Sequence, residues 1–338
     1  MTKIVSYYYR KLDSTEKGTY DNIVWGIQNM KTTIDCSGVR DIGTVFEDII
    51  FSHPEFYYVD QHYLISPGLT KKLNLKYRYA KRQLNEINLQ IETVMQEIIS
   101  SSINQYQSDY DKVLVLHDYL KKNLQYDDDA LNSFSRGNRG FENSFSILGA
   151  FLKRKCVCAG FSLAMKALCD KIGLECLVVS GTGSNSLFRG PHAWNIVRIN
   201  GYYHHVDVTW DNQFTDDITV PNYGYMNLDD ETIAKDHTWN KNNYPPCKDA
   251  PYNYFRINQS LIDSKAQLQK FLYENMLNEE EYIIFKVLKG SLLEKEIAGC
   301  LNDIMIQASN KCRHVSVNEF KYNWIPEQLV YMIQPAYK

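Results

Sequence analysis

The chain of 338 residues has no long apolar run. No stretch approaches the ~20 consecutive apolar residues that a membrane helix needs. Residues 1–30 also lack the apolar core of a signal peptide, because tyrosines and charged residues interrupt them. We therefore expect a cytoplasmic protein that contacts no membrane.

An excess of charge of one sign is also missing. The formal net charge is -3, and the tightest basic cluster is the tripeptide Lys153-Arg154-Lys155. A protein that binds nucleic acid through its phosphates usually carries a basic face or stripe. We therefore expect no nucleic-acid partner.

Cysteines are thinly spread, with 8 in the whole chain. Small secreted domains that depend on disulfides have a much denser framework. Cys169 and Cys300 stand in apolar surroundings and are predicted to be buried small hydrophobic residues. Internal repeats and low-complexity tracts are absent as well, and the 44% hydrophobic content argues against a disordered chain.

The length and the 44% hydrophobic content predict a globular protein of two or three domains. We expect residues 1–107 to be mostly helical with short strands, 108–250 to form a core that carries the chemistry, and 251–338 to form a small α/β domain. In the last part the pattern predicts a strand (254–257), a helix (261–274), a strand (282–287), a helix (292–309) and one or two further strands.

Cys158 is predicted to stand at the start of a helix. The apolar residues Phe161, Met165, Leu168 and Ile172 follow at helical spacing, and Gly173 is a typical helix end. Unpaired N–H groups and the helix dipole at an N-terminus favour a thiolate. The alternative is that Cys158 has only a structural role. Cys156 and Cys158 together lack the second pair that a structural zinc site requires, so we expect neither a metal nor a cofactor.

A β-hairpin is predicted next. His192–Ile199 and Tyr202–Trp210 alternate in polarity, and Asn200-Gly201 between them is typical of a two-residue type I′ turn. Such a turn pairs Ile199 with Tyr202, so that His192 faces Thr209 and stands diagonal to Asp207. His192 and Asp207 then share a face, roughly 7 Å apart at the backbone.

Asp207 inside a strand needs a partner if it is buried, and His192 is the obvious one. A base, a residue that orients it and a thiol nucleophile make up a catalytic triad. The role of His237 stays open at this point, as either a structural residue or one at the rim of a cleft.

Three segments carry a resemblance to the transglutaminase-like superfamily. They are Cys158-Ala159-Gly160-Phe161-Ser162, His192-Ala193-Trp194-Asn195 and His205-Val206-Asp207-Val208-Thr209-Trp210-Asp211. The resemblance covers 108–250 and is closest to bacterial members. It implies an α+β fold with a papain-like core, in which the nucleophile begins a helix packed against an antiparallel sheet. It also implies Cys158 as nucleophile, His192 as base and Asp207 as orienting residue. Members usually have Tyr at the position of Phe161 and often Gly at that of Arg154.

These observations predict acyl chemistry on a peptide or protein amide through a thioester at Cys158. Hydrolysis, by a protease or amidase, is favoured because water is the default acceptor. Transfer to an amine, as in transglutaminases, is an alternative, and so is a non-catalytic protein-binding module of the same fold. Cleavage of a glycan–asparagine amide is less favoured, because the cysteine pairs that bind zinc in such enzymes are absent. The oligomeric state stays open.

Overall fold

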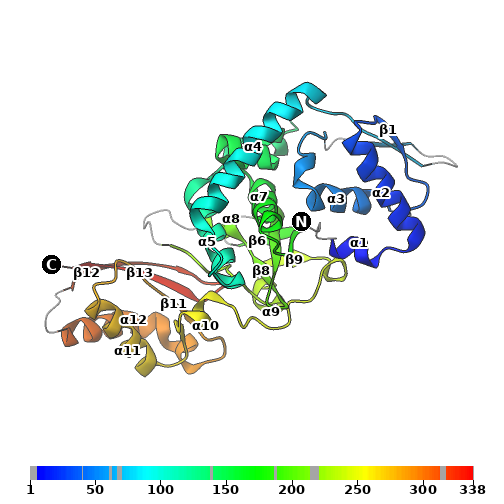
Figure 1. Ribbon diagram of the computed structural model, residues 1–338. Helices are drawn as coiled ribbons and strands as arrows, with labels where there is room; N and C mark the ends of the chain where they lie inside the picture. The colour runs from blue at the N-terminus through cyan, green and yellow to red at the C-terminus, as the bar shows by residue number, and fades with distance from the viewer. Residues whose placement is uncertain are drawn as a thin grey trace. The chain divides into compact units, whose positions relative to one another are not determined.

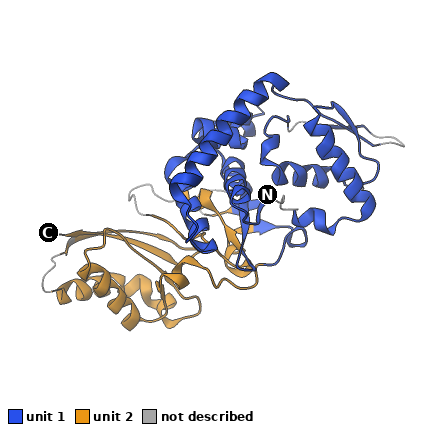
Figure 2. Ribbon diagram, viewed as in Figure 1, with its two compact units in different colours: residues 1–183, 189–203, 238–246 blue, residues 184–188, 204–237, 247–338 orange. Residues whose placement is uncertain are grey.

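The computed structural model describes residues 6–39, 41–60, 63–66, 71–137, 140–185, 189–213, 221–312 and 317–337. The chain forms two compact units (Figure 2). Unit 1 comprises Met1–Gly183, Arg189–Tyr203 and Thr238–Pro246, and unit 2 comprises Ser184–Phe188, His204–His237 and Cys247–Lys338. The domain boundaries predicted at 107 and 250 stay predictions, and each unit is described by itself.

The N-terminal part of unit 1 is helical with one small sheet (Figure 1). Its helices are α1 (Tyr7–Lys11), α2 (Ser14–Gln28), α3 (Ile42–Ser52), α4 (Lys81–Ser102) and α5 (Asp109–Asn123). The strands β1 (Thr33–Asp35), β2 (Leu64–Ser66) and β3 (Lys72–Asn74) form an antiparallel sheet in the order β1-β3-β2. Asp13 and Ser108 begin α2 and α5 with capping boxes, which satisfy the free N–H groups of the first turn.

The remainder of unit 1 places a buried helix against a sheet. Helix α7 (Cys158–Lys171) packs on strand β7 (Arg189–Ile199). The four-stranded sheet has the order β8-β7-β6-β9, with β6 (Cys176–Ser184), β8 (Tyr202–Val206) and β9 (His237–Trp239). Most of β8 (from His204), and the end residues Ser184 of β6 and His237 of β9, are counted in unit 2. Shorter elements precede α7: β4 (Gln125–Tyr126), α6 (Asp128–Ser135), η2 (Glu142–Phe145), η3 (Gly149–Lys153) and β5 (Lys155–Cys156). The molecule is thus an α+β protein with the predicted helix-on-sheet core.

The turn between β7 and β8 has the predicted form. Asn200 and Gly201 have φ angles of 47° and 91°, as a type I′ turn requires. The strand after it was predicted too long, because it ends at Val206 and helix α8 (Val208–Gln213) follows. The reason is that the Asp207 side chain accepts the N–H of Trp210 at 3.1 Å and so begins a helix. Thr209 is helical, so the predicted pairing of His192 with Thr209 is wrong.

Unit 2 contains a second sheet of four strands in the order β10-β11-β13-β12. The strands are β10 (Leu261–Ile262), β11 (Ile283–Val287), β12 (Val317–Ile325) and β13 (Val330–Tyr337). Helices α11 (Lys265–Leu277) and α12 (Leu292–Lys311) lie together on one face of it (Figure 1). Their buried side chains, such as Leu268, Leu272 and Ile297, form a core with Phe285 of β11.

One predicted strand of this region is wrong. Tyr254–Ile257 is a short helix, α10, because the Asn253 side chain accepts the N–H of Phe255 and begins a helical turn. The predicted helix at 261–274 begins four residues later than expected, after β10. Helix α9 (Asp230–Ile233), η1 (Pro54–Phe56) and η4 (Lys241–Asn243) complete the elements of the described residues.

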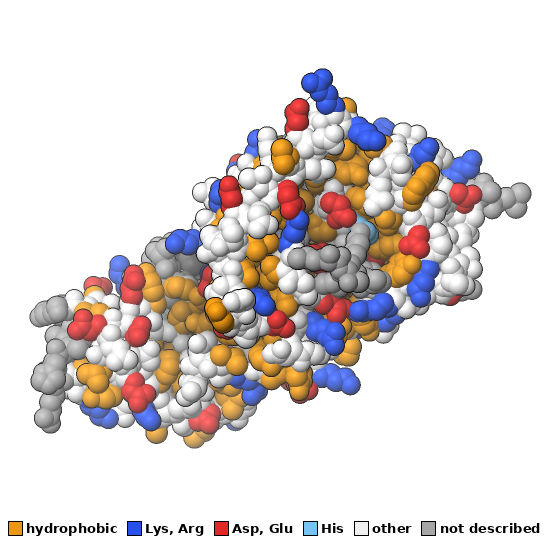
Figure 3. Space-filling model, viewed as in Figure 1, with side chains coloured by type: hydrophobic (Ala, Val, Ile, Leu, Met, Phe, Trp, Pro, Cys, Tyr) orange, Lys and Arg blue, Asp and Glu red, His pale blue; other side chains and the backbone are white. Residues whose placement is uncertain are grey.

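Two further findings concern the helices and the surface. Within the residues that the structure describes, no helix is long and apolar enough to cross a membrane. On the face drawn in Figure 3, basic and acidic side chains are interspersed.

Candidate active site

Cys158 is the first residue of α7, and its surroundings are buried. The preceding residue, Val157, has extended backbone angles and offers no side-chain cap to the free N–H groups of the helix. The Cys158 side chain is held in a nearly closed environment, with 9% of the residue exposed. An uncapped helix N-terminus is an environment that favours an anion.

Gly160 explains how the first turn of α7 packs so closely. A Cβ atom on Gly160 would lie 2.5 Å from Cβ of Cys156 and 2.8 Å from the carbonyl oxygen of Ser144. Only glycine fits there without a shift of the backbone. The turn that carries Cys158 is thus fixed against β5 and η2.

Cys156 differs from Cys158 although only one residue separates them. It lies on β5 with none of its surface exposed. Burial, and next the proximity of Cys158, raise the pKa of the Cys156 thiol well above its usual range. Both cysteines are free. Cys156 is therefore kept as a thiol, which fits its predicted role as a buried neighbour.

His192 lies on β7, the strand against which α7 packs, and is 5% exposed. Its ring is stacked at 5.9 Å from that of Trp194, which in turn meets the ring of Trp239 edge-on. Gly181 of β6 makes room for Trp194, because a Cβ there would lie 2.7 Å from the indole ring. The aromatic packing therefore fixes the strand beside His192.

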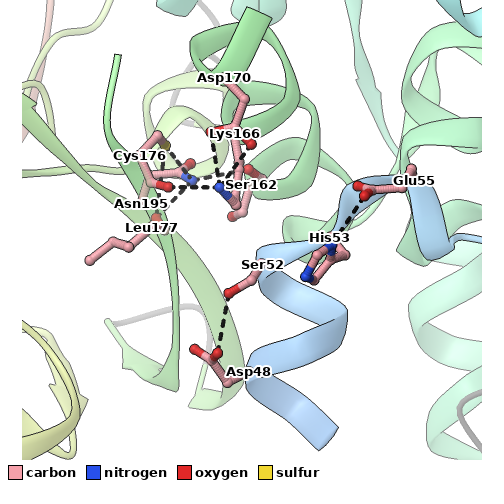
Figure 4. Close-up of polar contacts among 10 residues, drawn as sticks. All are labelled: Asp48, Ser52, His53, Glu55, Ser162, Lys166, Asp170, Cys176, Leu177 and Asn195. Carbon is pink, nitrogen blue, oxygen red and sulfur yellow. Dashed lines mark hydrogen bonds and ion pairs between the residues drawn. The ribbon is translucent and has the colours of Figure 1, made fainter. Parts of the chain in front are cut away.

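Asn195 joins the strand of His192 to the helix of Cys158 (Figure 4). Its side-chain amide donates to the carbonyl oxygens of Ser162 on α7 at 3.0 Å and of Leu177 on β6 at 3.2 Å. Ser162 is one helical turn beyond Cys158, and its hydroxyl bonds to the Cys158 carbonyl oxygen at 2.9 Å. This contact fixes the register of β7 on α7. In the sequence, Asn195 appeared only as the last residue of the segment His192-Ala193-Trp194-Asn195, with no role assigned to it.

A second polar contact holds the far end of α7 to the sheet. Lys166 is 5% exposed, and its ammonium group donates to the carboxylate of Asp170 at 2.9 Å and to the Cys176 carbonyl oxygen at 3.1 Å (Figure 4). Burial opposes the charge of Lys166, but Asp170 outweighs it and raises the pKa of the lysine. The helix that begins with Cys158 is thus tied to β6 along its length.

Asp207 belongs to unit 2 and stands between β8 and α8. It is 1% exposed. One carboxylate oxygen accepts the Trp210 N–H, and the other lies 3.1 Å from Nε2 of His237. Both oxygens therefore have a partner that fixes the plane of the carboxylate.

His237 is itself held by a second carboxylate. Nδ1 of its ring lies 2.6 Å from Asp236, whose other oxygen accepts the Tyr225 hydroxyl at 2.8 Å and the Gln328 amide at 2.9 Å. Both ring nitrogens thus face carboxylate oxygens, and all of these residues are at most 4% exposed. Burial, and then Asp236, raise the pKa of Tyr225 well above its usual range.

His237 therefore lies in the interior of unit 2, with none of its surface exposed. The predicted site residues are divided between the units, with Cys158 and His192 in unit 1 and Asp207 in unit 2. Sequence reasoning missed Asp236, Tyr225 and Gln328. Only Asp236, beside His237 in the sequence, offered a signal.

One further group of unit 2 has the donor types of a metal site. The donor atoms of His205, Asp230 and Cys247 lie within 4.8 Å of one another. The Asp230 carboxylate already lies 2.9 Å from the His205 ring and accepts the backbone N–H of Cys247 at 3.2 Å. Burial lowers the pKa of His205 and raises that of Cys247. The contacts among the three residues thus account for their arrangement.

A family model described as the transglutaminase-like superfamily matches residues 96–229. The resemblance predicted from the sequence is thereby confirmed, and this part of the chain is similar to the transglutaminase-like superfamily. It contains Cys158, His192 and Asp207, and ends before His237.

Two curated relatives match this chain over stretches of 149 and 133 residues. The kyphoscoliosis peptidase of Mus musculus is 23% identical over 149 residues, which cover 42% of this chain and 22% of the relative. That of Homo sapiens is 25% identical over 133 residues, 37% of this chain and 19% of the relative. The chain thus spans about a fifth of the length of the curated relatives that it matches.

Two solved structures are also similar. One is a TGase, 16% identical, with 47% of this chain and 46% of that chain covered and a TM-score of 0.33. The other is a candidate cysteine protease from Cytophaga hutchinsonii, 16% identical, with 41% and 51% covered and a TM-score of 0.29.

Proposed function

We propose that the chain is a cysteine hydrolase that cleaves an amide bond of a peptide or protein. The observation that carries the proposal is the placement of Cys158 at the uncapped start of α7, with His192 on the strand that α7 packs against. A thiol at a helix N-terminus and an imidazole on the adjoining strand are the parts of a nucleophile–base pair. The peptidase name of the curated relatives is in keeping with it.

In the proposed reaction, His192 takes the proton of the Cys158 thiol and the thiolate attacks the carbonyl carbon of the substrate. The tetrahedral intermediate collapses, the C–N bond breaks, and His192 returns the proton to the leaving amine. Water then attacks the thioester, His192 takes its proton, and the carboxylic acid and the thiol are released. The backbone N–H of Cys158 is a candidate donor to the developing oxyanion.

Asp207 is proposed to orient the ring of His192. The type I′ turn joins their two strands over only two residues and makes β7 and β8 neighbours in the sheet. Within unit 2, the Trp210 N–H and the His237 ring hold the Asp207 carboxylate in a fixed plane. A fixed carboxylate selects one tautomer of the base and stabilises the imidazolium that forms.

The proposal is tested by labelling the chain with a small excess of iodoacetamide between pH 5 and 8, followed by peptide mapping. Selective labelling of Cys158 at acidic pH, lost in His192→Ala, is the expected result. Slow and uniform labelling of the accessible cysteines would instead favour a non-catalytic binding module.

Transfer of the acyl group to an amine is the second candidate. The acceptor is decided by offering a labelled primary amine together with a glutamine-containing protein. We expect cleavage or deamidation without amine incorporation. Incorporation that depends on Cys158 would identify a transglutaminase.

A further inference from the structure

A buried lysine of unit 2 has few partners. Lys286 lies on β11, the strand between β10 and β13, with 9% of its surface exposed. Its ammonium group is 3.4 Å from the Gln328 side-chain oxygen and 5.9 Å from the centre of the Phe255 ring. Among the described residues, no carboxylate lies within ion-pair distance of it. Buried ammonium groups are normally paired, so this one is unusual.

Lys286 lines a cavity of about 100 Å³ that is open at one side. Three other cations, Lys235, Lys289 and Arg256, also line it, and its acidic residues are Asp229 and Glu231. With every one of these groups ionised, the four cations and two carboxylates leave a formal charge of +2. The pocket is thus electropositive in a chain whose net charge is -3.

The two acidic residues of the pocket are already engaged. Asp229 accepts the backbone N–H of Thr232 at 2.7 Å and begins α9, and Glu231 pairs with Lys289 at 3.3 Å. Neither carboxylate is within ion-pair distance of Lys235 or Lys286. Three cations of the pocket therefore lack an ion pair within the described part of the chain.

The cations also repel one another. Burial, and then the charge of Lys235, lower the pKa of Lys286 to about 7. Burial, and then the charge of Lys289, lower the pKa of Lys235. A bound anion would offset both the repulsion between Lys235 and Lys286 and that between Lys289 and Lys235.

We propose that this pocket binds a phosphate group, as the free dianion or as a phosphomonoester. The charge of a phosphate dianion matches the +2 of the lining, and its oxygens can accept from several lysine and arginine donors at the same time. The volume suits one tetrahedral oxyanion, while the open side admits the rest of a larger molecule.

The pocket adjoins the residues that hold Asp207. Gln328 accepts from Lys286 and donates to Asp236 at 2.9 Å, and Asp236 binds the His237 ring that faces Asp207. Every member of this hydrogen-bonded series belongs to unit 2. An effect of bound phosphate on catalysis rests on the proposed function. The binding of phosphate to this pocket does not.

Binding is tested by calorimetry on the full chain with inorganic phosphate at pH 7 and constant ionic strength. We expect saturable binding at one site, weakened at least tenfold in Lys286→Met and several-fold in Arg256→Gln. Arg256 is at the surface, so its variant leaves the fold intact. The matched control is Lys270→Met, whose side chain is 75% exposed, and it should bind as the unaltered chain does.

Sulfate serves as a dianion whose charge does not change with pH. Because Lys286 must be charged to bind it, affinity should fall about tenfold from pH 6 to pH 8 for a pKa of about 7. If O-phosphoserine binds more tightly than inorganic phosphate, the ligand of the pocket is a phosphomonoester. If it binds more weakly, the ligand is the free phosphate ion. No saturable heat with phosphate up to about 10 mM, or equal binding by Lys286→Met, would overturn the proposal.

Discussion

At the scale of the residue, the two neighbouring cysteines differ in what they face. Cys158 is at the start of α7, whereas Cys156 has no exposed surface and a raised pKa. We expect Cys158→Ala to abolish turnover and to leave the melting temperature within a few degrees. Cys156→Ala is the matched control, and should keep activity while losing about 1–2 kcal/mol of stability through the cavity it leaves. Full activity of Cys158→Ala would remove it as the nucleophile.

His237 is predicted to hold two buried carboxylates in place, because its ring nitrogens lie 3.1 Å from Asp207 and 2.6 Å from Asp236. Replacing it by Gln leaves at least one of these buried carboxylates without this partner, which should cost about 1–3 kcal/mol of stability. Denaturant unfolding measures the loss.

The matched control for His237 is His53→Gln. The partner of His53 is Glu55, whose side chain is 52% exposed, so its loss should cost less. Equal losses of stability for the two variants would contradict a special role for His237.

The ionisation of Asp48 makes the stability of the folded chain depend on pH. Burial raises its pKa to about 6, although hydrogen bonds from Ser6, Tyr20 and Ser52 oppose the rise (Figure 4 draws the last of these). The protonated form stabilises the folded chain fully below the unfolded pKa of 3.8, and this contribution is lost as the pH rises through 6.

Asp48→Asn should therefore gain about 1–3 kcal/mol over the unaltered chain between pH 4 and pH 7, for a shift of about two pKa units. Urea unfolding across that range measures the gap. A gap that does not change with pH would show that Asp48 titrates normally.

Residue types and short spacings could be interpreted from the sequence, but long-range partners could not. The helix face behind Cys158 and the Asn200-Gly201 turn are local patterns, and both were predicted. Asp236 and Gln328 are 92 residues apart in the chain. No local period links such residues, so this contact required the fold.

At the scale of the element, the close packing of the first turn of α7 gives a matched pair of variants. Gly160→Ala should cost about 1–3 kcal/mol and reduce activity, because its Cβ would lie 2.5 Å from Cys156 and displace the turn that carries Cys158. Gly299→Ala in α12 has nothing within 4 Å and should gain up to about 1 kcal/mol. Denaturant unfolding compares them, and a neutral Gly160→Ala would contradict the packing argument.

Element ends were harder to predict than element types. Tyr202–Trp210 alternates like a strand throughout, yet the chain turns into a helix after Val206. The side chain of Asp207 decides this by accepting the Trp210 N–H. A capping contact of one side chain outweighs an alternating pattern, as it also does at Asn253 before α10.

At the scale of the whole molecule, the chain passes between the two units several times. Residues 204–237 belong to unit 2 with 247–338, whereas 238–246 return to unit 1, where the N–H of Ser180 donates to the Tyr244 hydroxyl at 3.0 Å. The sequence predicted one boundary near 250, because composition and periodicity change there. The nine residues 238–246, which return to unit 1, show no such change in composition or periodicity.

This chain path predicts that 204–237 and 247–338 unfold together. Gln328 ties the two segments through its bonds to Asp236 at 2.9 Å and to the Thr232 carbonyl oxygen at 3.4 Å. Native-state hydrogen exchange in rising denaturant should therefore give the amides of β13 and those around Tyr225 the same opening free energy. Gln328→Leu should lower both equally, since it breaks both ties. If residues 251–338 opened alone, with Tyr225 still protected, they would be the independent domain that the sequence predicted.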